Sequence, residues 1–166
     1  MPEKKECAAP RQTGPSINHE NHGPDNLLHG ELTRRIIGCS MRVHSTLGNG
    51  FQEVIYQRAL AIEMTLDGLR FEREKTMAIF YRDQHIGTRR VDFFVEGAIM
   101  VELKAVINLE DVHLAQAMNY LEAYHMQIGL LINFGARSLV FKRVHNNKLL
   151  DHDSGHDSKT GKMSDP

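Results

Sequence analysis

The segment AIMVELKA, residues 98–105, decides how the rest of the sequence is interpreted. Its odd-numbered residues are all apolar, which predicts a β-strand with one buried face. The other face carries Glu102 and Lys104, which lie two residues apart and therefore on the same side of the strand. Because a charge inside an apolar segment is costly unless it is paired or bound to a metal, these two side chains are candidates for a functional site.

A second acid lies on the strand that precedes this segment. That strand is predicted over residues 87–95, and Asp92 stands there between the apolar residues Val91 and Phe93. An acid in such a position has the same unusual setting as Glu102. Whether the two carboxylates can meet depends on the length of the turn between the strands.

A turn of two residues would place Asp92 and Glu102 on opposite faces of the hairpin. A turn of three residues, 96–98, would pair Val95 with Ile99 and place the two acids across from each other. The glycine within this segment can adopt the positive φ that such a turn needs. The longer turn therefore predicts two carboxylates and one ammonium group on a shared face.

Two converging carboxylates repel each other, and a divalent cation would relieve that repulsion. Hard oxygen ligands suit Mg²⁺ or Mn²⁺. Lys104 could then stabilise a developing anion, or position and deprotonate water. The structural alternative is a salt-bridged trio of Asp92, Glu102 and Lys104 on a solvated sheet face, because motifs this short also occur by chance.

The composition is that of an ordinary globular protein. The chain has 166 residues, of which 41% are hydrophobic and 25% charged, which predicts one domain. The net charge of −1 argues against a protein that coats nucleic acid through bulk charge. No apolar stretch is long enough to suggest a membrane span, and residues 1–16 hold no secretory h-region. With Cys7 and Cys39 read as free thiols, we expect a cytoplasmic protein that does not bind membranes.

Proline placement predicts the domain boundaries. Four of the five prolines lie at or before Pro24, and the fifth is Pro166. We therefore expect a flexible arm over residues 1–28, a folded domain over 29–146 and a polar disordered tail over 147–166.

Periodicity predicts three helices and six strands in this domain. The order ααββββαββ indicates an α/β fold with a mixed central sheet flanked by helices. The helices are predicted over 31–47, 52–66 and 110–126, and the strands over 69–73, 77–81, 87–95, 98–105, 128–134 and 138–144.

The chain resembles the GxxExxY proteins, a branch of the PD-(D/E)XK nuclease-like superfamily. The resemblance covers about residues 31–144 and implies a restriction-endonuclease-like core. Val91 stands where the superfamily name has proline. The matching motifs, in order, are Gly50-Phe51-Gln52-Glu53-Val54-Ile55-Tyr56, Asp92 with Glu102-Leu103-Lys104, Val112-His113-Leu114-Ala115-Gln116 with Tyr120-Leu121, and Gly129-Leu130-Leu131-Ile132-Asn133-Phe134-Gly135.

The resemblance assigns a role to each candidate site residue. It implies that Asp92 and Glu102 bind Mg²⁺ or Mn²⁺, with the Leu103 carbonyl as a third ligand, and that Lys104 acts on water or on the charge of the transition state.

Two helical residues complete the expected catalytic set. The resemblance implies that Glu53 joins the acid cluster and that Gln116 lies beside the site, where its amide could orient water or a phosphate. The alternatives are a glutamate that complements the helix dipole and a polar helix face.

These residues predict a metal-dependent nuclease that hydrolyses phosphodiester bonds of nucleic acid. The alternatives are a non-catalytic module that binds nucleic acid or a protein on the same fold, and a hydrolase of nucleotides or other phosphate esters. The choice between DNA and RNA, between endonuclease and exonuclease, and between monomer and homodimer stays open. Phosphate contacts could come from four basic residues near the site, unless these only protect a sheet edge: Lys75, Arg82, Arg89 and Arg90.

Overall fold

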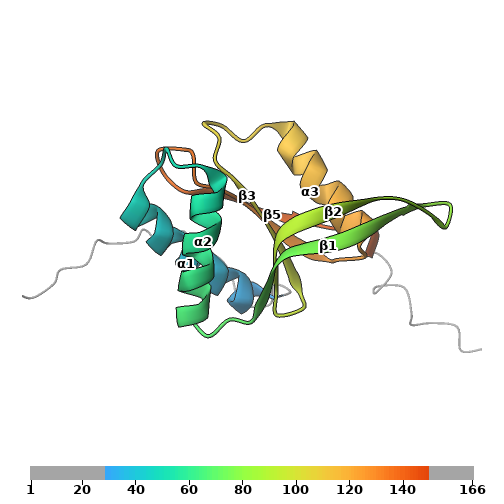
Figure 1. The fold of residues 1–166 in the computed structure, drawn as a ribbon, viewed down its shortest axis with the longest axis horizontal. Coiled ribbons are helices and arrows are strands. Elements are labelled where there is room, and N and C mark those ends of the chain that lie inside the picture. The colour runs from blue at the N-terminus through green and yellow to red at the C-terminus, as the bar shows by residue number, and fades with distance from the viewer. Residues whose placement is uncertain (1–28, 150–166) are drawn as a thin grey trace, which may run out of the picture.

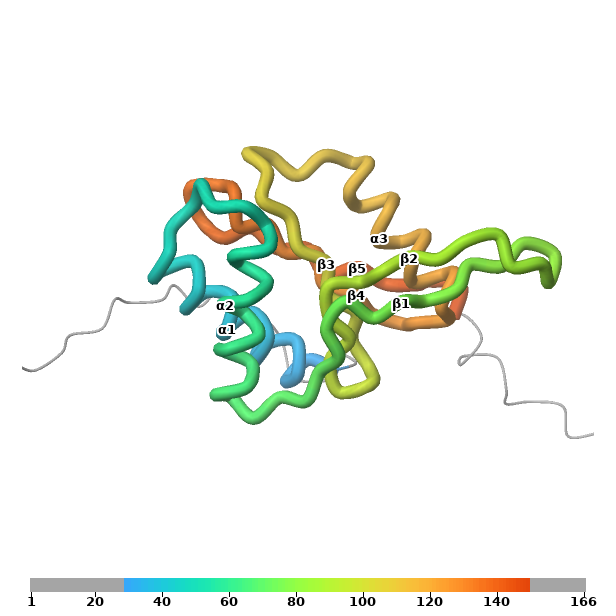
Figure 2. The backbone as a smooth tube through the Cα atoms, viewed as in Figure 1, coloured from blue at the N-terminus to red at the C-terminus, as the bar shows by residue number. Residues whose placement is uncertain are grey.

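The computed structural model describes residues 29–149, in which helices pack on both faces of one mixed β-sheet (Figures 1 and 2). The expected α/β fold class is therefore confirmed. The expected arm, 1–28, and most of the expected tail, from residue 150 on, lie outside the described residues. The elements are α1 (Gly30–Leu47), α2 (Glu53–Leu66), β1 (Phe71–Tyr81), β2 (Gln84–Val95), β3 (Ile99–Lys104), α3 (Asp111–Ala123), β4 (Ile128–Asn133) and β5 (Val140–His145).

The five strands lie in the sheet in sequence order, β1-β2-β3-β4-β5. Among the strands of residues 29–149, β3 and β4 pair in parallel and the other neighbours are antiparallel, and α3 forms the crossover between β3 and β4. The expected order contained one strand too many, because residues 69–73 and 77–81 contribute to one strand. Glu74 takes a positive φ of 51°, which interrupts the alternation of side chains while the pairing with β2 keeps its register on both sides.

The sheet separates two apolar clusters, so β3 and β4 are buried on both faces. One cluster joins the sheet to α1 and α2 through residues such as Ile36, Tyr56 and Val101. The other joins it to α3 through Met100 and Leu121. Glu102, an even-numbered residue of β3 like Met100, thus belongs to the strand face that turns toward α3.

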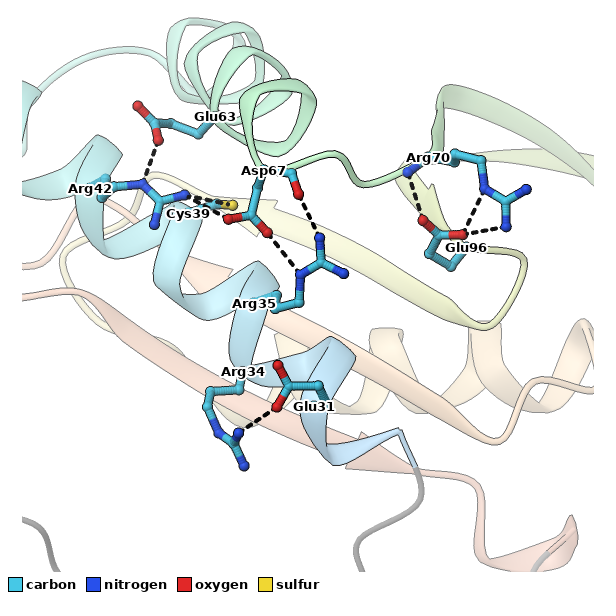
Figure 3. A network of polar contacts seen from close by, with 9 residues as sticks. All are labelled: Glu31, Arg34, Arg35, Cys39, Arg42, Glu63, Asp67, Arg70 and Glu96. Atoms are coloured by element: carbon cyan, nitrogen blue, oxygen red, sulfur yellow. Dashed lines mark hydrogen bonds and ion pairs between the residues drawn. The ribbon is translucent and has the colours of Figure 1, made fainter. Parts of the chain in front are cut away.

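Polar side chains hold α1 against α2 (Figure 3). Arg35 Nε donates to Asp67 Oδ2 at 2.9 Å, and Arg42 Nε donates to Glu63 Oε2 at 2.6 Å. Arg42 also contacts the sulfur of Cys39, whose thiol pKa is raised by burial. These contacts fix the position of α2, the helix that carries Glu53.

The turn between β2 and β3 has the expected length of three residues, since Val95 pairs with Ile99. Glu96 and Gly97 both take left-handed conformations, with φ of 51° and 67°. For a non-glycine residue this conformation is unfavourable. Arg70 offsets the cost because its backbone N–H and its guanidinium both donate to the Glu96 carboxylate (Figure 3).

No helix within residues 29–149 combines the length and the apolar character needed to cross a bilayer.

Candidate active site

The candidate site lies where β2 parts from β3. The two strands pair only from Val95 opposite Ile99 to Phe93 opposite Val101. At the next residue, the side chain of Asp92 takes the place of a ladder hydrogen bond, because its Oδ2 accepts from the backbone N–H of Leu103 at 2.7 Å. The register expected from the turn thus brings Asp92 to the backbone of the strand that carries Glu102 and Lys104.

Gln57 on α2 binds the other oxygen of Asp92. Its Nε2 donates to Asp92 Oδ1 at 2.9 Å, while its Oε1 accepts from Arg73 at 3.0 Å. The Arg73 contact fixes which end of the amide faces the aspartate. Both carboxylate oxygens of Asp92 therefore accept hydrogen bonds from the protein.

Glu102 has a different environment. Only 8% of its side chain is exposed, and its Oε1 accepts from Lys104 Nζ at 3.0 Å. Arg89 contributes a longer ion pair of 3.8 Å to the same oxygen. Glu102 Oε2 is buried and has no hydrogen-bond partner within residues 29–149, so the described part of the chain satisfies only one oxygen of this carboxylate.

Burial is the main influence on the ionisation of Glu102. It raises the pKa of this carboxyl, Lys104 works against the rise, and the negative charge of Asp92 adds to it. The negative charge of Asp92 therefore disfavours the ionised form of Glu102.

Lys104 is held in place at the end of β3. Its side chain is 13% exposed, and the residue pairs with Asn133 of the parallel strand β4. The buried Asn133 side chain accepts from the N–H groups of Val106 and Gly135 and donates to the Val106 carbonyl. This clamp fixes the backbone immediately after Lys104.

Glu53 begins α2 and lies at the same site. Burial raises the pKa of its carboxyl, Lys104 opposes the rise and Asp92 adds to it. Glu53, Gln57 and Asp92 line one pocket of about 220 Å³, together with Arg90. The structure thus brings Glu53 to the Asp92 side of the acid pair.

Tyr56 and Gly50, which belong to the same motif as Glu53, orient the start of α2. The hydroxyl of Tyr56 donates to the Gly48 carbonyl at 2.9 Å and accepts from the N–H of Phe51 at 3.1 Å. Gly50 has a φ of 105°, a conformation that glycine adopts at little cost. These contacts close the loop from which α2 sets out with Glu53.

Gln116 lies on the α3 side of the site and is linked to the acids only through other residues. It is hydrogen-bonded to Tyr120, and the guanidinium of Arg89 lies 4.9 Å from the centre of the Tyr120 ring. The chain of contacts thus runs from Gln116 through Tyr120 and Arg89 to Glu102. Each basic residue expected to contact phosphates also has a contact within the protein, Lys75 with Glu72 and Arg90 with Glu74 among them.

The donor set fits a divalent cation in part. Within residues 29–149, no three His, Cys, Asp or Glu side chains are grouped closely enough to hold a metal ion. Two carboxylates are available at the strand junction, and the bare Oε2 of Glu102 is the donor atom that a cation would use. The ligand set expected from the sequence, which includes the Leu103 carbonyl, therefore stays a prediction.

Two residues of the site, Gln57 and Asn133, were not among the site residues predicted from the sequence, and Arg89 was expected to contact phosphate rather than Glu102. Gln57 lies one turn after Glu53 on the same helix face, a spacing that could have pointed to it. Arg89 reaches Glu102 across the splayed strands, and Asn133 acts through its amide clamp. The contacts of both depend on strand placement, which short-range patterns do not reveal.

One comparison with known proteins identifies the family of the chain. No curated protein matches the chain. A solved crystal structure, that of SSO0001, matches with a TM-score of 0.41 and 16% sequence identity; the match covers 64% of this chain and 60% of that chain. The family model of the PD-(D/E)XK nuclease superfamily matches residues 30–144, a range that includes every residue of the candidate site. The chain belongs to the PD-(D/E)XK nuclease superfamily.

Proposed function

We propose that this protein is a metal-dependent nuclease that hydrolyses phosphodiester bonds of nucleic acid at Asp92, Glu102 and Lys104, and that it belongs to the GxxExxY branch of its superfamily. The observation that supports this most is the buried Oε2 of Glu102, which lacks a hydrogen-bond partner in the described part of the chain while Lys104 donates to the other oxygen. A buried oxygen without a partner is costly in a purely structural ion pair. It is expected in a site that binds a ligand.

We propose Asp92, Glu102 and the Leu103 carbonyl as the residues that hold Mg²⁺ or Mn²⁺. The cation would lower the pKa of a bound water and neutralise charge on the phosphate. Gln57 keeps Asp92 oriented, and Lys104 places its ammonium group beside Glu102, where it can donate to a phosphate oxygen. In the hydrolysis, the water oxygen forms the new bond to phosphorus, the ester bond breaks, and the leaving oxygen takes up a proton.

Glu53 and Gln116 have assisting roles in this proposal. The raised pKa of Glu53 suits a group that accepts a proton from water and later releases it. Gln116 acts through Tyr120, whose ring supports Arg89.

The test is incubation of the purified chain with single- and double-stranded DNA and RNA in Mg²⁺, Mn²⁺ or EDTA. The wild type should cut at least one substrate with metal and none in EDTA. Glu102→Gln should lower the rate by about 10²-fold or more, because it removes charge at the centre of the site. Glu122→Gln, a change on the surface of α3 where Glu122 pairs with Lys148, is the matched control and should keep the wild-type rate.

A non-catalytic binding module is the second candidate. It is favoured by the net charge of −1 and by the lack of a third acid close enough to complete a metal cluster within residues 29–149. Such a module would bind nucleic acid or a protein and cut nothing in any metal. Cleavage of simple phosphate esters but of no polynucleotide would indicate the third candidate, a phosphate-ester hydrolase.

The cellular setting is part of the same proposal. We place the protein in the cytoplasm, where the buried free thiol of Cys39 would stay reduced, and we name nucleic acid as its partner. Whether it forms a homodimer can be measured by analytical ultracentrifugation.

A further inference from the structure

The two strands of the β1–β2 hairpin are much longer than the other strands of the sheet. They have 11 and 12 residues, whereas β3, β4 and β5 have six each. The pairing of β2 with β3 ends at Phe93. From Val91 to the turn, the two strands of the hairpin therefore pair only with each other. Figures 1 and 2 both show the hairpin extending past α3 and away from the rest of the molecule.

The tip of this hairpin carries large apolar side chains that nothing in the described chain covers. Phe80 is 62% exposed, Tyr81 61% and Ile86 62%. Phe80 and Tyr81 are consecutive in the strand, so their rings lie on opposite faces of the ribbon. The ladder shifts register between Ile79 and Phe80, which leaves Ile86 as the extra residue of the opposite strand.

The tip places a cation beside its aromatic rings. Residues 75–90 contain four basic side chains and one acidic one, and two of the basic ones, Lys75 and Arg90, are paired with Glu72 and Glu74 just outside this stretch. At the tip itself, the guanidinium of Arg82 lies 5.5 Å from the centre of the Tyr81 ring, and the ring of His85 meets that of Phe80 edge-on at 5.8 Å. Aromatic rings with a cation beside them are suited to a polyanion that carries π-faces.

We propose that the hairpin tip, residues 80–86, inserts Phe80 and Tyr81 among unpaired bases of a nucleic acid, while Arg82 contacts a neighbouring phosphate. This inference rests on the proposed function and adds its substrate class: DNA or RNA in which unpaired bases adjoin a duplex. A hairpin tip with an aromatic ring on each face can stack against a base on either side, because the face of a base is apolar. A flat partner would cover only one of the two rings.

The same hairpin links the tip to the candidate active site. Eight residues of β2 separate Gln84 from Asp92, which corresponds to roughly 26 Å at the rise of a strand. This is about the length of eight stacked nucleotides. One nucleic acid can therefore reach both ends of the hairpin.

The experiment measures binding in EDTA, where the full-length chain cannot cut, so that binding is separated from chemistry. The probes are a gapped duplex with 2-aminopurine in the gap, as DNA and as RNA, and the same duplexes fully paired. The tip variant is Phe80→Ser with Tyr81→Ser. The matched control is Ile62→Ser with Leu66→Ser, two exposed apolar residues of α2 that are 62% and 78% exposed.

The tip variant should bind the gapped probe about tenfold or more weakly and lose the change in 2-aminopurine fluorescence, because two stacking rings are gone. Its affinity for the paired duplex and its circular dichroism should match those of the control. The DNA and RNA arms identify which polymer is preferred.

An unchanged affinity of the tip variant for the gapped probe overturns this inference, and so does an equal loss on the paired duplex. Nuclease activity of the wild type would still stand in either case. Conversely, tip-dependent binding without cleavage in any metal supports the inference and removes the nuclease. A wild-type dimer that the tip variant abolishes, with no effect on nucleic acid, would show that a second copy covers the tip, which also overturns the inference.

Discussion

Asp92 and Glu102 differ in how the protein satisfies their oxygens. Both oxygens of Asp92 accept N–H donors, one from the backbone of Leu103 and one from Gln57. Glu102 has one oxygen bound to Lys104 and one without a partner among the residues that the structure describes. Asp92 thus stabilises the fold as well as contributing to the site, whereas the ionised Glu102 lowers the stability of the fold. Neutralising the two acids should have opposite effects on stability.

Glu102→Gln should stabilise the protein at neutral pH and in EDTA, by about 2–4 °C in Tm. Because burial raises the pKa of Glu102 above its value in the unfolded chain, the unfolded state releases this proton first as the pH rises. Stability contributed by the protonated group is therefore lost between the ordinary glutamate pKa and the raised one, and the cost persists above that range. Thermal unfolding from pH 4 to 8 checks this, since the variant should lack that part of the pH dependence. A variant less stable than the wild type at pH 7 would show that Glu102 is a structural partner of Lys104.

Asp92→Asn should destabilise the protein by about 1–3 kcal/mol. An amide can accept from only one of the two donors, and its NH₂ group would face the other. Chemical denaturation in EDTA measures the loss. Asp83→Asn, a change in the exposed β1–β2 turn, is the matched control and should leave the unfolding midpoint in place. An Asp92→Asn midpoint equal to that of the wild type would contradict the hydrogen bonds assigned to Asp92.

Sequence patterns were sufficient for some of these residues and insufficient for others. Strand alternation placed Glu102 and Lys104 together, because the two residues are neighbours on one strand face. It did not predict that Asp92 would bind the backbone of Leu103, since this depends on the strands parting at that point. The pairing of Gln57 with Asp92 likewise requires the packing of a helix on a sheet.

At the scale of elements, the end of β3 is positioned by close packing against the loop that follows β4. A Cβ on Gly135 would lie 2.4–2.5 Å from backbone atoms of Ala105 and Val106, closer than real contacts allow. The Asn133 clamp joins the same two segments. The small size of Gly135 therefore allows the backbone after Lys104 to take its place.

Gly135→Ala should destabilise the fold by about 1–3 kcal/mol, because the added methyl group must push backbone apart, and it should lower nuclease activity through Lys104. Gly87→Ala is the matched control. Gly87 lies in β2, where an added Cβ would meet open space and the backbone does not take a positive φ. Denaturation curves and cleavage rates of both variants check the prediction. Equal unfolding midpoints for the two variants would mean that the loop after β4 can shift to accommodate the added methyl group.

The elements themselves were largely predictable, because their periodicities are strong and no proline interrupts residues 25–165. The exception is β1. The run of charged residues around Glu74 reads as a break between two strands, but the hairpin partner β2 holds both halves in one ladder. Pairing between strands overrode the local pattern there.

For the whole molecule, metal binding should be linked to folding. If Asp92 and Glu102 hold a divalent cation, Mn²⁺ at 100 times its Kd should add about 2.7 kcal/mol to the free energy of unfolding. The melting temperature should rise accordingly in the wild type and stay constant in Glu102→Gln. Binding should also strengthen as the pH rises through the raised pKa of Glu102, because the proton competes with the cation. A melting curve that ignores millimolar Mn²⁺ would argue against the metal site.

The most direct test of the nuclease account combines cleavage and metal binding in one variant. Lys104 contacts Glu102 and cannot itself ligate a cation, so Lys104→Ala should keep most of the Mn²⁺ affinity measured by calorimetry. Its cleavage rate should fall by about 10²-fold or more, while its affinity for nucleic acid falls only by the value of one phosphate contact. Lys142→Ala, on the exposed edge strand β5, should behave as the wild type. A folded, metal-loaded wild type that cuts neither DNA nor RNA, or a Lys104→Ala variant that cuts as fast as the wild type, would contradict the account.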